Sequence, residues 1–265
     1  MLRRGITAVG EGTLGLFSKG KRIIEGVGRA TLFVIQTLGW TLRPPFRFRL
    51  VVAAGQYIGT ESLPIISLTA LSIGAIFALQ SASGFAMFGA ESLVGSTVAL
   101  SLALELAPVL TGLMVAGRAA SGIATEIGSM RVTEQIDAME AMAVEPIQYL
   151  VVPRFLASLV VFPALNAIFN LIGNIGSYLV GVGLLQLDAG VYLNKIYWLL
   201  EPKDLASGMW KALVFGAIVS LTGCFKGYYA TGGAQGVGRA TTDAVVTSSV
   251  LILIADYILT ATFFT

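Results

Sequence analysis

The chain has 265 residues, of which 55% are hydrophobic and 12% are charged, and its mean hydropathy is +0.82. Because a soluble domain carries about a quarter charged residues, this composition excludes a soluble protein and indicates an integral membrane protein. The length allows about five or six apolar spans of roughly 20 residues each and little else. We therefore expect one all-α membrane domain over residues 1–265.

Basic residues are concentrated at the N-terminus, where nine of the 17 Lys and Arg residues lie before residue 50. This excess indicates a segment that faces the cytoplasmic membrane surface, and not a nucleic-acid site. The longest apolar piece of this region, Ala30 to Leu42, is about 13 residues long and too short to span a bilayer. We interpret residues 1–49 as an N-terminal interfacial region of one or two amphipathic helices. It lacks the cleavage pattern of a secretory signal, so we expect it to be retained.

The sequence offers little for catalysis. Histidine is absent, which excludes His-based acid-base chemistry, Ser-His-Asp triads and most zinc sites. Gly15, Gly20 and Lys21 have the spacing of a phosphate-binding loop, but Arg22 stands where a Ser or Thr would hold magnesium. We therefore predict no catalytic residue, no metal site and no cofactor bound by this chain. If ATP is used, a partner must hydrolyse it.

Five apolar segments are long enough to be transmembrane helices. They are expected at about residues 62–82, 93–116, 155–185, 206–225 and 245–264, and the first has a start as early as Leu50. Together they predict a five-span bundle over residues 50–264. A Ser, Ala and Gly-rich turn is expected at 81–89, and a Gly-rich loop after Lys226.

The positive-inside rule sets the orientation of these spans. If the N-terminus and the loops at 118–154 and 226–239 are cytoplasmic, 14 of the 17 Lys and Arg residues lie on that side. Only Lys195, Lys203 and Lys211 are then outside. Five spans place the C-terminus on the periplasmic side.

Two carboxylates fall within the apolar spans. Glu105 lies about halfway along the second span, where an ionised carboxylate costs several kcal/mol unless it is paired or hydrated. It either faces a polar cavity in the transport path or pairs with a basic group, or else it makes a structural hydrogen bond in the bundle. Asp256, in the fifth span, is open to the same two interpretations.

Small and amide side chains repeat at helical spacing in the second and third spans. The residues that share a face are Asn166, Asn170 and Asn174, with an adjoining stripe at Gly173, Ser177 and Gly181, and a further stripe at Gly112, Ala116, Ala120 and Ala124. Close helix packing is the favoured interpretation, and a polar substrate lining is the alternative.

The loop that follows Arg118 has the pattern of a short amphipathic helix between Met130 and Ala143. Its apolar stripe consists of Val132, Ile136, Met139 and Ala143, and its acids are Glu134, Asp137 and Glu140. A helix this polar cannot span, so it lies on the membrane or docks into a groove on a partner. The acidic face disfavours anionic headgroups and favours a protein partner.

The stretch ELAPVLTGLMVAGRAASGIATEIGSMRVTEQIDAMEAMAVEP closely resembles the signature of MlaE-type permeases, the membrane subunits of Mla and Mce lipid ABC transporters. That family includes a chloroplast envelope relative. The resemblance extends over nearly the whole chain, through the basic N-terminus, the five spans, the late Gly-rich loop with its RATT sequence, and the Asp of the last span. A motif of this length is highly specific.

The resemblance implies the membrane subunit of an ATP-driven transporter that moves phospholipid between the inner membrane and the outer envelope of a diderm bacterium. The implied partners are a second copy of the chain in a homodimer, a cytoplasmic ABC ATPase that holds ATP and Mg, and a ring of Mce-domain proteins. The lipid cavity would lie between the two permease subunits. Its candidate residues here are Ile76, Leu79, Gln80, Leu100 and Glu105.

The resemblance also implies a cytoplasmic coupling helix between spans 2 and 3, within a coupling segment over residues 123–150. The residues that would contact the ATPase are Glu134, Gln135, Ile136, Asp137, Ala138 and Met139.

The chain departs from one branch of the family at Leu104, where that branch has an Arg before the Glu, and at Ser81 and Ala82, where it has a Gly-Tyr pair. Two other functions stay open. One is an ion-coupled secondary transporter that uses Glu105 and Asp256, although five spans without an evident inverted repeat disfavour it. The other is a membrane assembly subunit that anchors partner proteins.

Overall fold

A computed structural model describes residues 24–45 and 47–264 of the chain. Over these residues the regular structure is helical and contains no strand, which confirms the predicted all-α membrane protein. The described helices that are long and apolar enough to cross a membrane number five, as predicted. They are Phe48–Ala86, Glu91–Val132, Ile147–Leu184, Pro202–Tyr228 and Gly233–Thr262.

The chain divides into two compact units, Met1–Pro45 and Phe46–Thr265. In the first unit, residues 24–41 form a helix. Exposed apolar side chains with helical spacing are Ile24, Val27, Ile35 and Leu38. They share one face, as an amphipathic helix requires. Its location at a membrane interface stays a prediction, and the rest of the predicted interfacial region, residues 1–23, lies outside the described residues.

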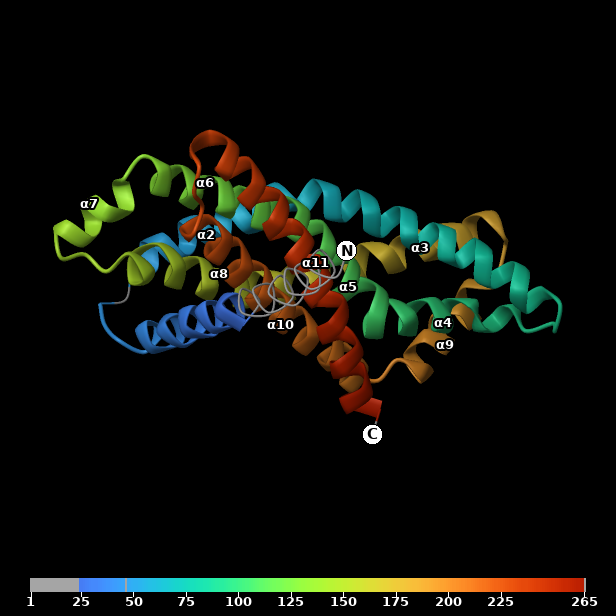
Figure 1. The fold of residues 1–265 in the computed structure, drawn as a ribbon. Helices are drawn as coiled ribbons and strands as arrows, with labels where there is room; N and C mark the ends of the chain where they lie inside the picture. Colours follow the sequence, from blue (N-terminus) through green and yellow to red (C-terminus); the bar gives the residue numbers. More distant parts are fainter. Residues whose placement is uncertain (1–23, 46, 265) are drawn as a thin grey trace, which may run out of the picture. The chain divides into compact units, whose positions relative to one another are not determined.

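The second unit contains the five spans, several of which are built from more than one helical piece (Figure 1). The first consists of α2 (Phe48–Gly59), η1 (Thr60–Ser62) and α3 (Leu63–Ala86). The second consists of η2 (Glu91–Leu93), α4 (Val94–Ser101), η3 (Leu102–Leu106), α5 (Ala107–Val115), η4 (Ala116–Ala120) and α6 (Ser121–Val132). The third consists of η5 (Ile147–Val151), α8 (Val152–Tyr178) and η6 (Leu179–Leu184).

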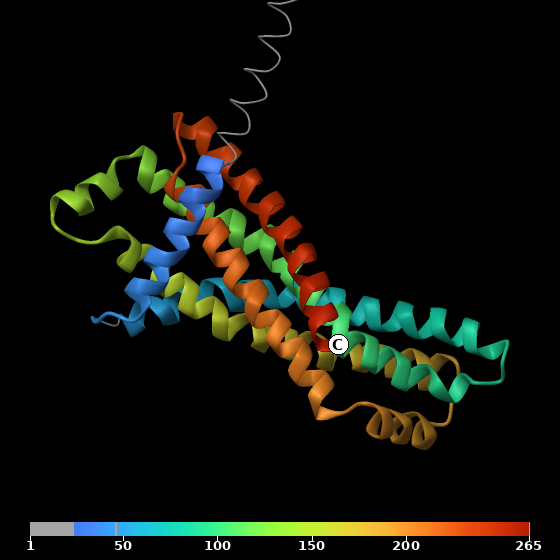
Figure 2. The same cartoon turned by 60° about the horizontal axis from the view of Figure 1, so that its bottom comes forward.

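The fourth and fifth spans are single helices, α10 (Pro202–Tyr228) and α11 (Gly233–Phe264). Two short helices lie in the connections, α7 (Gln135–Ala141) and α9 (Ala189–Leu199). Figures 1 and 2 both place α7 and α9 at opposite ends of the second unit. The fold therefore separates a short helix on one side of the spans from a short helix on the other.

All five spans are longer than the segments predicted. The second has 42 residues, which at 1.5 Å per residue is about 60 Å, against a hydrocarbon thickness of about 30 Å. The predicted end of the second span is too early and the predicted start of the third is too late, because the prediction places the arginines between them in a loop. These arginines instead lie in or beside helices and pair with acids: Arg118 with Glu61, Arg131 with Asp137, and Arg154 with Glu126. The expected loop at 118–154 is thus largely helical.

The turns of the chain are also shorter than predicted. The expected turn at 81–89 is helical as far as Ala86, and the expected Gly-rich loop is helical from Gly233 onward. Gly232 and Gly233 have φ values of +94° and +66° and make the sharp reversal between α10 and α11. Because glycine adopts such φ values without steric cost, a four-residue connection is sufficient.

Prolines account for two widened turns in the spans. Pro108 has no N–H to donate to the carbonyl of Leu104, and Pro153 has none for Tyr149. Leu104 and Tyr149 both lie in π-helical segments, η3 and η5. A π-turn rotates the side chains that follow it relative to a regular helix, and π-turns are frequent at functional sites. Glu105 lies on the widened turn of η3.

The predicted small-residue stripes are helix contacts. A Cβ on Gly74 of α3 would overlap the carbonyl oxygen of Gly173 on α8, so these backbones touch. A Cβ on Gly223 of α10 would lie 3.1 Å from backbone atoms of Ala120, and the next turn of α10 packs on Ala124 in the same way. Packing, and not a substrate lining, is therefore the use of these stripes, as favoured from the sequence.

The asparagine row of α8 faces the interior. Asn166 and Asn170 are buried. Asn170 donates its amide to the Asn166 carbonyl at 3.1 Å, and Asn174 donates to the Asn170 carbonyl at 2.9 Å. These bonds satisfy amide donors within the helix itself, which is how polar side chains are accommodated among apolar spans.

Candidate functional site

A cluster of charged side chains lies inside the bundle, among η3, α10 and α11. Lys211 Nζ is 2.6 Å from Glu105 Oε2 and 3.1 Å from Asp256 Oδ1. It also donates to Thr260 Oγ1 at 2.6 Å, and Thr260 donates to Glu105 Oε1 at 3.1 Å. One ammonium group on the fourth span therefore joins a carboxylate of the second span to a carboxylate and a hydroxyl of the fifth. We call these four residues the ionic cluster.

The members of the ionic cluster differ in exposure. The Lys211 side chain is 2% exposed, the Asp256 side chain 20% and the Glu105 side chain 37%. The ammonium group is thus enclosed, while the Glu105 carboxylate opens toward the surface of this chain. Because a lone ammonium would be very unfavourable at this depth, the two acids and the threonine are what allow Lys211 to be buried.

Close packing positions the cluster. Gly208 lies one turn before Lys211 on α10, and a Cβ there would overlap the carbonyl oxygen of Ala103 in η3. The absence of a side chain brings the two backbones together, so Lys211 reaches Glu105 across a short gap. The π-turn beside Pro108 aims Glu105 at the same point.

The structure corrects the prediction for Lys211. The positive-inside count places it among the basic residues outside the membrane, but it is buried within α10 because Glu105 and Asp256 neutralise it. A signal was present, since Lys211 falls inside the predicted fourth span and charged residues within spans are rare. Glu105 pairs with a basic group and also accepts a hydrogen bond from Thr260 within the bundle, and Asp256 shares the same basic partner.

The other candidate cavity residues lie on the outer surface of this chain. Ile76 is 57% exposed and Leu79 is 42% exposed, Gln80 is exposed, and Leu100 is half-buried. The opposite face of α3 carries the buried Ala70, Gly74 and Ala78. Ile76, Leu79 and Gln80 therefore share the face of α3 that points away from α8.

The candidate coupling segment contains two helices instead of the single helix predicted between Met130 and Ala143. α6 ends at Val132, α7 begins at Gln135, and Glu134 between them has a φ of +61°. That left-handed residue changes the direction of the chain, so the expected apolar stripe does not continue from Val132 into α7.

The residues of α7 divide into an anchor and an exposed surface. Ile136 is fully buried, and Met139 is half-buried. The remaining candidates are exposed: Glu134, Gln135, Asp137 and Ala138. Ile136 thus holds α7 on its own chain, and the surface available to another molecule is acidic, with the exposed Met142 beside it.

Two polar contacts add to this anchor. Arg131 donates to Asp137 Oδ1 at 2.5 Å, which links the end of α6 to α7. Tyr228, the last residue of α10, donates its hydroxyl proton to Glu140 Oε1 at 3.2 Å. α7 therefore contacts the ends of two spans. Sequence reasoning missed the second contact because the two residues are far apart in the chain.

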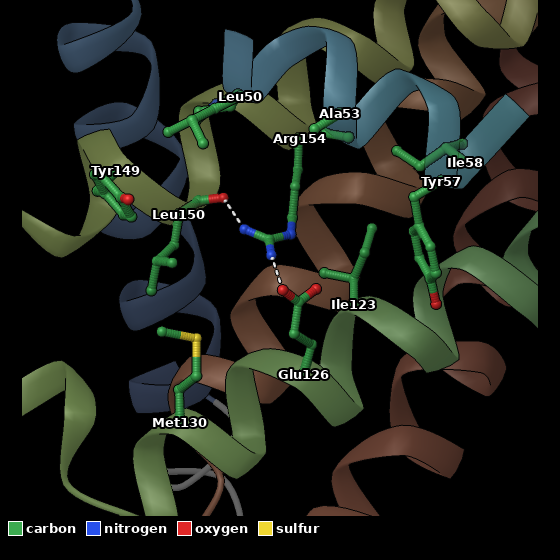
Figure 3. A pocket seen from close by; sticks show the side chains of 12 residues that line it. Leu50, Ala53, Tyr57, Ile58, Ile123, Glu126, Met130, Tyr149, Leu150 and Arg154 are labelled. Atoms are coloured by element: carbon green, nitrogen blue, oxygen red, sulfur yellow. Dashed lines mark hydrogen bonds and ion pairs between the residues drawn. The ribbon is translucent and has the colours of Figure 1, made fainter. Parts of the chain in front are cut away.

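A cavity of ≈ 480 Å³ lies among α2, α6 and the start of the third span (Figure 3). Arg154 points into it, pairs with Glu126 at 2.7 Å and donates to the Leu150 carbonyl at 2.6 Å. Much of the remaining lining is apolar, with Tyr57 and Tyr149 at its sides. Since Arg154 and Glu126 neutralise each other, they stabilise the packing of α6 on α8.

Comparison with known proteins gives a consistent result. The family model described as Permease MlaE matches residues 51–262. The chain is 47% identical over 243 residues to a probable ABC transporter permease protein of Rickettsia bellii, with 92% of this chain and 94% of that protein covered. It is 38% identical over 252 residues to the intermembrane phospholipid transport system permease protein MlaE of Haemophilus influenzae, with 92% and 95% covered. It is also 38% identical over 206 residues to the chloroplastic protein TRIGALACTOSYLDIACYLGLYCEROL 1 of Arabidopsis thaliana, with 78% and 59% covered.

Proposed function

Because the chain belongs to the MlaE permease family, we propose that it is the membrane subunit of an ATP-driven transporter that moves phospholipid between the inner membrane and the outer envelope. The observation that carries this proposal is the match to a phospholipid transport permease along nearly the full length of both chains. The five apolar helices support a multi-pass protein of the inner membrane.

In this function the chain is a non-catalytic subunit, and a cytoplasmic ABC ATPase binds ATP and Mg. Ile136 would be the anchor that holds α7 in place, and the residues that contact the ATPase would be the exposed candidates Glu134, Gln135, Asp137 and Ala138. Support comes from the position of α7, which lies at one end of the five-span unit and presents an acidic, solvent-accessible surface (Figure 1). An orientation with α7 and the N-terminus in the cytoplasm follows the positive-inside rule.

A second copy of the chain completes the lipid path in this proposal. The exposed face of α3, with Ile76 and Leu79, is apolar and would line a cavity between two subunits. Leu100 and the open carboxylate of Glu105 would lie near it. Acyl chains need such an apolar surface, because burial of each CH₂ group contributes about 0.8 kcal/mol. A ring of Mce-domain proteins on the periplasmic side would receive or deliver the lipid.

The test is reconstitution of the permease with its ATPase and Mce-domain partner in vesicles that contain a fluorescent phospholipid. ATP is expected to drive lipid movement to the partner. Ala138→Arg, on the exposed side of α7, is expected to weaken ATPase binding about tenfold or more, or about 1.4 kcal/mol, because a bulky positive side chain changes the shape and the charge of an acidic contact surface. Asn194→Arg, on exposed α9 at the other end, is the matched control and should have no effect.

Two outcomes would contradict the proposal. If an ion gradient drives transport of a solute by the purified chain alone, and ATP has no effect on that transport, the chain is a secondary transporter. If the complex assembles and hydrolyses ATP but phospholipid never copurifies with it or moves, the chain is an assembly subunit.

A further inference from the structure

We infer that the hydrogen bond from Tyr228 to Glu140 is the contact through which α7 sets the position of α10, and with it the Glu105–Lys211 ion pair. Tyr228 is then a positioning residue for transport, about 25 Å along α10 from the ionic cluster. The inference rests on the proposed function, since it assigns a consequence to movement of α7 by an ATPase.

Two helical rods run from the region of α7 to the ionic cluster. The first is the helical segment Glu91–Val132, which carries Glu105 and leads through Glu134 into α7. The second is α10, which carries Lys211 and ends at Tyr228. The Glu105–Lys211 pair joins the rods inside the bundle, and the Tyr228–Glu140 hydrogen bond joins them again at α7.

α7 is firmly attached to the first rod. Two residues separate it from α6, Arg131 pairs with Asp137 at 2.5 Å, and Ile136 is fully buried. A force on α7 therefore reaches α6 through the chain itself. It reaches α10 through Glu140 and Tyr228, and through the contact between α6 and α10.

α10 transmits displacement along its length. It is one continuous α-helix, and no proline follows Pro202 within it. Gly223 and Gly227 bring its last turns against backbone atoms of α6, where a Cβ on Gly227 would lie 2.9 Å from the Ala124 carbonyl oxygen. Such small-residue contacts let helices slide past each other in small steps without loss of packing. The hydrogen bond between Tyr228 and Glu140 selects one of these positions of α10 relative to α6.

The ionic cluster is sensitive to such a step. A normal N–H···O hydrogen bond measures about 2.7–3.2 Å, so a step of α10 that carries Lys211 away from Glu105 would lengthen and weaken the 2.6 Å contact between them. Glu105 is the exposed member of the cluster, and its carboxylate would then be released toward the proposed lipid path. Tyr228 thereby couples the position of α7 to the charge presented to the lipid.

The test separates ATP hydrolysis from lipid movement in the reconstituted complex. Tyr228→Phe removes one hydroxyl and keeps the ring, so the fold and ATPase binding should be retained. We expect ATP hydrolysis within about twofold of wild type and a loss of about tenfold in lipid moved per ATP, the size expected when a hydrogen bond to a charged group is lost. Tyr197→Phe, on the exposed α9, is the matched control and should leave the ratio unchanged.

Variants of Glu140, which accepts the hydrogen bond from Tyr228, provide a second test. Glu140→Gln keeps an acceptor oxygen and should retain most of the coupling, whereas Glu140→Leu should match Tyr228→Phe. The Tyr228→Phe/Glu140→Leu double variant should be no worse than either single variant, because both remove the same bond. Additive losses would mean that Glu140 acts on the ATPase directly and would overturn the inference. An unchanged lipid-to-ATP ratio in Tyr228→Phe would also overturn it, while wild-type complex without ATP-driven lipid movement would instead refute the proposed function.

Discussion

Lys211 Nζ lies 2.6 Å from Glu105 Oε2, although the two residues are 106 positions apart and belong to different spans. The distance explains how a carboxylate is held within the second span without a basic residue at its side. Residue 104, directly before Glu105, is a leucine, and the positive charge comes instead from α10. The pair also ties α10 to η3 where Gly208 already brings the backbones together.

Loss of the ammonium group should be severely destabilising. Lys211→Met would leave Glu105 and Asp256 facing each other without a cation, and the removal of one partner from a buried ion pair costs about 3–5 kcal/mol. Glu105→Gln should cost less, because Lys211 keeps Asp256 at 3.1 Å. Thermal unfolding of the purified variants in detergent measures which of the two loses more stability.

Lys203→Met is the matched control for that series. Lys203 also pairs with an acid, Glu201 at 2.8 Å, but its side chain is 74% exposed. Exposed pairs add little to stability, so its unfolding temperature should equal that of wild type. Equal unfolding temperatures for Lys211→Met and Lys203→Met would show that the ionic cluster does not stabilise the bundle.

The backbone contact beneath the ionic cluster should tolerate no side chain. In Gly208→Ala the new methyl group would overlap the Ala103 carbonyl oxygen, so α10 must move away from η3. Overpacking of this kind costs about 1–3 kcal/mol, and the displacement should also lengthen the Glu105–Lys211 contact. Gly84→Ala in α3 is the control, because nothing lies within 4 Å of its new methyl group. If both variants unfold at the wild-type temperature, the close approach is absent in the membrane.

The sequence predicted the spans well and their ends poorly, for a physical reason. Apolar length alone identifies a membrane helix, so five segments were found. Charge alone does not end one, because Arg118 and Arg154 stay in helices when an acid or a carbonyl from a neighbouring element satisfies them. Those partners are distant in sequence. The break at Glu134 was missed for a related reason, since a left-handed glutamate has no strong local signal.

Only the acidic members of the ionic cluster could be predicted from the sequence. The acids Glu105 and Asp256 stood out as charges in apolar segments, and the need for a partner followed from the cost of burial. Which partner they share depends on how the spans pack, and that is decided by contacts such as Gly208 with Ala103. Lys211 was therefore assigned to the wrong side of the membrane boundary, even though it lay in a predicted span.

The docking of α9 should depend on pH through Tyr192. This side chain is buried, bonds Ser177 at 2.5 Å, and lies where a Cβ on Gly95 or Gly181 would come within 2.7 Å of its ring. Burial raises the pKa of Tyr192 above its ordinary value of 10.0, and the bond to Ser177 lowers it to a lesser extent. A buried group with a raised pKa favours the docked state below its ordinary pKa, and that contribution is lost as pH rises through the raised value.

Tyrosinate absorbance provides the measurement for this docking. The difference in absorbance between wild type and Tyr192→Phe should show one tyrosine that ionises above pH 10.0. Over the same range of pH, α9 should undock in wild type alone. A difference titration at or below pH 10.0 would contradict the burial of Tyr192. At neutral pH, Tyr192→Phe should lose about 0.5–1.5 kcal/mol, the net value of one hydrogen bond.

The proposed orientation can be tested by labelling, because Cys224 is buried and should not react. Met142, beside α7, is 67% exposed, and Tyr197, on α9, is 86% exposed. With the chain expressed without its ATPase, a membrane-impermeant maleimide should label Tyr197→Cys in cells with a permeabilised outer membrane and Met142→Cys in inverted inner-membrane vesicles. The reverse pattern would place α7 in the periplasm, where no ATPase could reach it. Labelling of both sites from one side would require an even number of crossings between them, against the single crossing by the third span that the structure provides.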